Sequence, residues 1–93
     1  MIPSELPNFV EILKKRALIH PERDCVIFLE NENEQPTTMS YYQNDISAKI
    51  VANNFKKIGI FKGDRVIILL PNSLEFIKIF FGCLYGGILA VPL

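Results

Sequence analysis

The sequence predicts an α/β fold built around a βαβ unit with buried parallel strands. Residues 65–70 read RVIILL, an apolar run without the polar alternation of a half-exposed strand, and such runs are typical of parallel sheets that are covered on both faces. Residues 74–84 follow as a helix that is apolar almost all round, which favours a buried element. Residues 88–91, ILAV, read as a second apolar strand after Gly86-Gly87. Strand, helix and strand in this order make a βαβ unit.

The N-terminal region is predicted to form a helix. Asn8 is the expected N-cap, with Glu11 at the third helical position of a capping box. The basic run 14–16 falls in the last turns, where cations complement the helix dipole, and we prefer this structural interpretation to a binding patch. The helix should stop at His20-Pro21, because a residue before proline is disfavoured in the α region. Its apolar face consists of Phe9, Ile12, Leu13 and Ala17.

A β-hairpin and a second helix are expected next. Residues 25–29, CVIFL, and residues 37–39, TTM, are β-type runs on either side of the polar turn 31–34. Ser40 is expected to cap the second helix, with Gln43 completing a capping box. The predicted apolar stripe of that helix is Tyr42, Ile46 and Ile50 at helical spacing, widened by Ala48, Val51, Ala52 and Phe55. Gly59 is a natural stop for the helix, and residues 62–64 are predicted to form a turn before the next strand.

No catalytic, cofactor-binding or metal-binding constellation is visible in the sequence. Asn72 is expected to cap the third helix, with Glu75 at the third helical position. It is the one residue with some claim to a site, because ligands of open α/β sheets bind at the carboxyl ends of strands. The single histidine, His20, has no acidic or nucleophilic partner nearby in the sequence and is interpreted as a turn residue. The tyrosines Tyr41, Tyr42 and Tyr85 are interpreted as packing aromatics.

The composition argues against two classes of function. Ten basic and ten acidic residues cancel, so the chain lacks the basic face that a nucleic acid partner requires. Cys25 and Cys83 lie far apart and have no CxxC spacing, so a zinc site is not expected. Both cysteines are predicted to be small buried hydrophobic residues, although a single disulfide between them stays open.

The N-terminus and the apolar C-terminal stretch indicate where in the cell the protein is expected. The first residues lack the basic start, apolar core and cleavage site of a signal peptide, which predicts a cytoplasmic protein. No membrane span is expected, because the uncharged residues 79–93 are fewer than the ~20 that a spanning helix needs. Gly86-Gly87 and Pro92 also interrupt that stretch.

The apolar surface of residues 65–93 exceeds what a chain of 93 residues is expected to cover. A doubly covered parallel sheet needs several strands and helices on both faces. We therefore expect residues 1–93 to be part of a larger α/β domain whose remaining segments complete the cover. The alternative is a self-contained small interaction module that dimerises through its apolar C-terminal half.

Four sequence motifs, considered together with their order and spacing, extend over nearly the whole chain. They read FVEILKKRALIHPERDCVIF at 9–28, MSYYQNDI at 39–46, GDRVIILLPNSLE at 63–75 and FFGCLYGGILAVPL at 80–93. Together they resemble the N-terminal segment of the adenylate-forming (AMP-binding) superfamily, closest to the fatty acyl-AMP ligases. The sequence departs from the family pattern at Gly86, where the family usually has alanine.

The resemblance implies a parent enzyme that joins a fatty acid to AMP from ATP, releases pyrophosphate and passes the acyl group to an acyl carrier protein. ATP and Mg²⁺ are implied for the full-length family. The family's phosphate loop, nucleotide contacts and C-terminal lysine lie further along than residue 93. Residues 1–93 are therefore expected to be a truncated N-terminal part of the large domain, a partial subdomain that acts as a non-catalytic scaffold.

Overall fold

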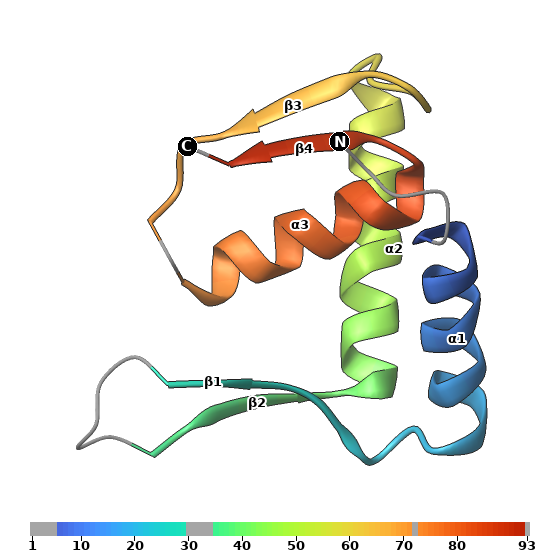
Figure 1. Cartoon of the computed structure of the whole chain (residues 1–93), viewed down its shortest axis with the longest axis vertical. Coiled ribbons are helices and arrows are strands. Elements are labelled where there is room, and N and C mark those ends of the chain that lie inside the picture. The colour runs from blue at the N-terminus through green and yellow to red at the C-terminus, as the bar shows by residue number, and fades with distance from the viewer. Residues whose placement is uncertain (1–5, 30–34, 72, 93) are drawn as a thin grey trace.

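The chain folds as three helices that pack beside two small sheets (Figure 1), in a computed structural model that describes residues 6–29, 35–71 and 73–92. The predicted α/β class is confirmed, because two of the strands are parallel and a helix connects them. In chain order the elements are α1 (Leu6–Ile19), β1 (Asp24–Phe28), β2 (Thr37–Ser40), α2 (Tyr41–Lys57), β3 (Arg65–Ile68), α3 (Leu74–Gly86) and β4 (Leu89–Pro92).

Helix α1 differs from the prediction at its start. It begins at Leu6, so the prediction that Asn8 is the N-cap is wrong. Pro7 explains the earlier start, because the first N–H groups of a helix have no intrahelical partner and a proline in the first turn loses nothing. The end at Ile19 is confirmed, and the N–H of His20 still donates to the carbonyl of Arg16 at 2.7 Å.

The predicted hairpin and the cap of α2 are both confirmed. Strands β1 and β2 are antiparallel, with Val26 opposite Met39, while the predicted turn 31–34 lies outside the described residues. The N–H of Gln43 donates to Ser40 Oγ at 3.1 Å, and the N–H of Ser40 donates to Gln43 Oε1 at 2.9 Å. Gly59 follows α2 with a φ of 87°, the left-handed conformation expected of a helix stop.

The βαβ unit forms as predicted, with two corrections to its details. Strands β3 and β4 are parallel, and Arg65 lies opposite Leu89. Strand β3 ends at Ile68, two residues short of the predicted run 65–70. The N-cap of α3 is Ser73, whose Oγ accepts from the N–H of Phe76 at 3.2 Å. The prediction of a cap at Asn72 is therefore wrong, and that residue lies outside the described ones.

Helices α2 and α3 pack directly against each other at a glycine. A β-carbon placed on Gly82 would overlap the side chain of Val51, so the close approach of the two helices depends on the missing side chain. Both cysteines are free: Cys83 is buried beside this contact and Cys25 is half-buried. The buried apolar residues are Val10, Leu13, Ala17, Met39, Ala48, Ile68, Cys83 and Ile88.

In the described part of the chain, no helix combines the length and the apolar character needed to cross a bilayer.

Candidate functional site

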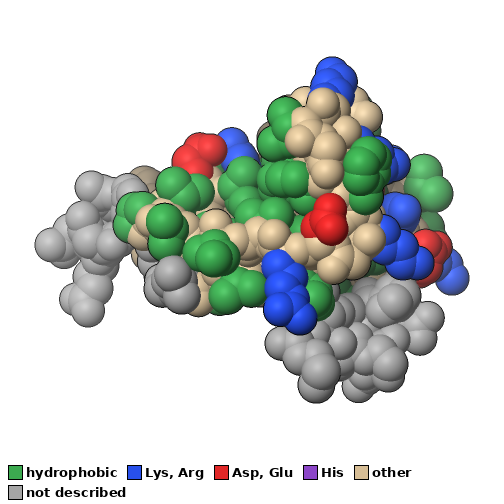
Figure 2. Space-filling view, turned by 90° about the horizontal axis from the view of Figure 1, so that it is seen from above, with side chains coloured by type: hydrophobic (Ala, Val, Ile, Leu, Met, Phe, Trp, Pro, Cys, Tyr) green, Lys and Arg blue, Asp and Glu red, His purple; other side chains and the backbone are tan. Residues whose placement is uncertain are grey.

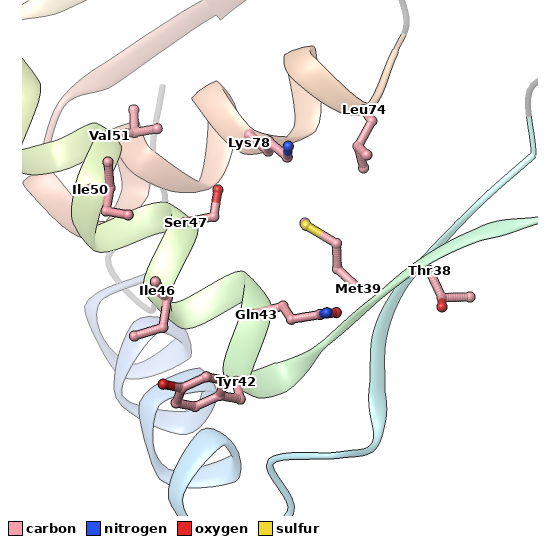
Figure 3. Close-up of a pocket in the computed structure, with 10 residues that line it drawn as sticks. All are labelled: Thr38, Met39, Tyr42, Gln43, Ile46, Ser47, Ile50, Val51, Leu74 and Lys78. Atoms are coloured by element: carbon pink, nitrogen blue, oxygen red, sulfur yellow. The ribbon is translucent and has the colours of Figure 1, made fainter.

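A groove opens between β2, α2 and α3, and we refer to it as the α2–α3 groove. It has a volume of about 490 Å³. Figure 3 shows side chains of α2 along one wall, with Leu74 and Lys78 of α3 opposite Met39 of β2. The lining residues are Thr38, Met39, Tyr42, Gln43, Ile46, Ser47, Ile50, Val51, Leu74 and Lys78.

The apolar stripe of α2 forms this wall of the groove and is exposed. Tyr42, Ile46 and Ile50 have exposed fractions of 55%, 38% and 55%. The helical spacing of the stripe is confirmed, because all three side chains line one groove. The described residues leave these three side chains partly uncovered. Burying these large apolar side chains against another surface would be favourable. The wall therefore has the character of an interface.

The opposite face of α2 is buried even though it carries polar residues. The hydroxyl of Tyr85 donates to Asp45 Oδ1 at 2.7 Å, and Lys49 pairs with the other carboxylate oxygen at 2.7 Å. Lys14 of α1 lies 5.4 Å from the centre of the Tyr85 ring. This cluster ties the three helices together, so Lys14 of the basic run 14–16 contributes to packing. Asn44 is also buried here, and its Oδ1 finds no partner among the described residues.

The pKa of Tyr85 is raised well above the usual value of a phenol. Burial is the larger cause, followed by the hydrogen bond to Asp45 and the charge of that carboxylate. The neutral phenol is therefore a stable donor near neutral pH and is unsuited to act as a base. Tyr85 was predicted to be a packing aromatic, and this prediction did not include the hydrogen bond of its hydroxyl to Asp45. The spacing of residues in the sequence gives no means to detect such a bond.

The wall of α3 brings the one charged side chain among the described lining residues into the groove. Lys78 Nζ lies 3.8 Å from Glu75 Oε1. The side chain of Glu75 is 71% exposed and that of Lys78 is 34% exposed. A pair this long, whose carboxylate is mostly exposed, contributes little, so the lysine is available to a further partner.

A second apolar surface lies on the β3 side of the molecule. Ile68 faces inward and is buried, whereas Ile67 and the following Leu69 are 60% and 75% exposed. Figure 2, which views the molecule from the β3–β4 end, shows hydrophobic side chains gathered on this face. The expectation of an uncovered apolar flank is confirmed.

Metal ligands and nucleophiles are the remaining candidates for chemistry among the described residues. Groups of three or more histidine, cysteine or acidic side chains that could hold a metal ion are absent from them. Burial raises the pKa of the Cys83 thiol to about 11, so the thiol is protonated near neutral pH and is a poor nucleophile. His20 is exposed just after α1. The α2–α3 groove is therefore kept as the candidate site.

Comparisons with known proteins agree on one family. The sequence signature of the AMP-binding enzyme family matches residues 13–93. The chain is 32% identical over 92 residues to the medium-chain-fatty-acid–[acyl-carrier-protein] ligase JamA of Moorena producens. The matched region is 99% of this chain and 15% of JamA. This chain is also 34% identical over 88 residues to the long-chain-fatty-acid–CoA ligase FadD13 of Mycobacterium tuberculosis. The matched region is 95% of this chain and 17% of FadD13.

Solved structures give the same result for the fold. The fatty acid AMP ligase from Legionella pneumophila matches with a TM-score of 0.83 and 35% identity, over 100% of this chain and 16% of that one. A Mycobacterium tuberculosis fatty acyl CoA synthetase matches with a TM-score of 0.75 and 33% identity, over 98% of this chain and 17% of that one. The chain thus spans about 15–17% of the length of these relatives.

Proposed function

The chain belongs to the AMP-binding enzyme family, and from this premise we propose that residues 1–93 form the N-terminal part of the large domain of a fatty acyl-AMP ligase. The observation that carries the proposal is the match to the Legionella pneumophila fatty acid AMP ligase over the whole chain, with a TM-score of 0.83. The match to the fatty acyl CoA synthetase is lower, at 0.75, so the AMP ligase branch is favoured.

The parent reaction would activate a fatty acid for transfer. A carboxylate oxygen of the fatty acid attacks the α-phosphorus of ATP, the bond from that phosphorus to the bridging oxygen breaks, and pyrophosphate leaves. The thiol of a carrier protein's phosphopantetheine arm then loses its proton and attacks the acyl carbon, and AMP leaves. JamA is by name a ligase of fatty acids and an acyl carrier protein, which supports a carrier protein as the acceptor.

The described residues do not fit the ion that such a reaction uses. Mg²⁺ prefers carboxylate and phosphate oxygens, and the described part of the chain has no acidic cluster that would hold it. We place no step of the reaction on this segment. Its role is that of a scaffold, in which the cluster around Asp45 and Tyr85 holds the helices while the exposed faces meet other parts of the enzyme.

A chimera tests this proposal. Residues 1–93 replace the matching segment of the Legionella pneumophila ligase, and pyrophosphate exchange that depends on fatty acid and ATP is measured. We expect exchange by the chimera and none by residues 1–93 alone. A folded chimera that fails to exchange, beside an active parent ligase, would contradict the ligase assignment. Exchange by residues 1–93 alone would contradict the scaffold role.

The dimerising interaction module gains no support from the comparisons, which place the chain within relatives several times its length. Sedimentation of residues 1–93 separates the two ideas directly. A folded dimer with a cooperative thermal transition would favour the module, because the apolar surfaces would then cover one another.

A further inference from the structure

The exposed wall of the α2–α3 groove has a shape and charge that point to one kind of occupant. We propose that the groove receives a single apolar segment of the remainder of the adenylate-forming large domain, and that this segment places a carboxylate against Lys78. The inference rests on the proposed function and deepens it by naming the surface and the chemistry of the contact.

The first support is the uncovered stripe of α2. The side chains of Tyr42, Ile46 and Ile50 present a ridge at helical spacing, each between one third and three fifths exposed. Figure 1 places α1 on the far side of α2 from the groove, so no described helix of this chain is positioned to cover the ridge. A ridge of this spacing is the surface into which another helix or an extended apolar segment packs.

The second support is the position of Lys78. Its side chain lies in an otherwise uncharged lining, two-thirds buried, and its ion partner Glu75 is 3.8 Å away and largely exposed. An occupant that covers the groove removes water from the ammonium group. That removal is costly unless a carboxylate replaces the water. Charge complementarity therefore requires an acidic side chain, or another anionic group, in whatever fills the groove.

The third support concerns the kind of occupant. A free fatty acid would satisfy both the apolar wall and the ammonium group, but small-molecule sites bury roughly 70–90% of their ligand. Ile46 and Ile50 remain 38% and 55% exposed in the groove wall, and such an open wall suits a protein segment better. The relatives also have the necessary chain, since this one spans only 15–17% of their length.

Maleimide labelling of an introduced cysteine tests the proposal without relying on activity. Ile50→Cys is made in residues 1–93 and in the chimera described above, and mass spectrometry identifies the labelled residue. We expect Ile50→Cys to react at least tenfold more slowly in the chimera than in residues 1–93. Asn53→Cys, on the same helix and outside the groove lining, is the matched control and should react equally in both proteins. Ile46→Cys serves if the first variant does not fold.

Two further arms address the carboxylate and the rival ligand. In the chimera, Lys78→Glu should restore fast labelling, whereas Lys78→Met, which keeps an apolar stem and removes the charge, should restore it less. Equal labelling of Ile50→Cys in the two proteins would overturn the proposal. Protection of Ile50→Cys by added dodecanoate in residues 1–93 alone would also overturn it, in favour of a fatty acid site. Pyrophosphate exchange by the same chimera reports separately on the proposed function.

Discussion

The two faces of α2 differ in a way that reverses the usual expectation. The inner face carries Asn44, Asp45 and Ala48 and is buried against α1 and α3. The outer face carries larger apolar side chains, among them Ile46 and Ile50, and is exposed. Small and hydrogen-bonded groups pack at close helix–helix contacts, so the inner face holds the described residues together. The outer face is suited to a contact made with other protein. On α2, burial therefore follows the available packing partners rather than the hydrophobicity of the side chains.

The largest expected effect is on the inner face, at Gly82. Gly82→Val places a branched side chain where a β-carbon alone would overlap Val51, and overpacking of this kind costs about 3 kcal/mol at the upper end of its usual range. We expect the free energy of unfolding, measured in urea, to fall by that amount or the chain to fail to fold. Such a result would confirm that the inner face carries the stability.

Gly86→Ala is the matched control for this substitution. A β-carbon at Gly86 would lie 3.1 Å from Ile88 Cδ1, a side-chain end that can move, and 3.7 Å from Ala52 Cβ. The small adjustment is offset by the better helix propensity of alanine, worth up to about 1 kcal/mol. The free energy of unfolding should change by less than about 1 kcal/mol. Equal losses for the two glycine variants would break the distinction drawn here.

An intermediate effect is expected at Tyr85, and it carries a pH dependence. Tyr85→Phe removes the hydrogen bond to Asp45 and should cost about 1 kcal/mol near neutral pH. The pKa of Tyr85 is raised in the folded state by burial and by Asp45. The folded chain therefore keeps a proton that the unfolded chain loses above about pH 10, and stability falls as the pH rises beyond that value.

The pH dependence of the Tyr85→Phe variant isolates this contribution. Cys83 also has a raised pKa, of about 11, and adds a decline of the same sign in both proteins. The free energy of unfolding, followed from pH 8 to pH 11, should therefore fall less steeply in the variant than in the unmodified chain. Parallel curves would mean that burial and Asp45 do not raise the pKa of Tyr85.

The smallest effect is expected on the outer face. Ile50→Asp changes a side chain that is 55% exposed, and substitutions at exposed positions usually stay near 0.5 kcal/mol. The thermal midpoint of residues 1–93 should therefore hardly move. A loss comparable to that of Gly82→Val would show that the stripe already supports the fold of this chain, and the contrast between the two faces would disappear.

Local patterns predicted most of the elements and fewer of their boundaries. The capping box at Ser40 and the left-handed stop at Gly59 follow from residue chemistry over a few positions, and both are confirmed. The predicted N-caps at Asn8 and Asn72 are wrong, because α1 already begins at Leu6 and Ser73 caps α3. Competition between neighbouring capping residues is decided by small energy differences that the sequence pattern does not resolve.

The candidate site was only partly predictable. Helical spacing gave the stripe of Tyr42, Ile46 and Ile50, yet the spacing alone does not say what the stripe faces. The hydrogen bond between Tyr85 and Asp45 joins residues that are 40 positions apart. No local pattern reports such a contact, so the polar interior of the helix cluster emerges only from the packing.

The two ends of the βαβ unit are held together unequally. At one end, the N–H of Gly63 donates to the carbonyl of Gly87 at 2.9 Å, and the N–H of Leu89 donates to the carbonyl of Asp64 at 2.8 Å. These two hydrogen bonds connect the turn before β3 to the turn after α3. At the other end, Ile68 lies opposite Pro92, which has no N–H to donate. Fraying of the strand pair should thus begin at Pro92 and reach the end held by Gly63 and Leu89 last.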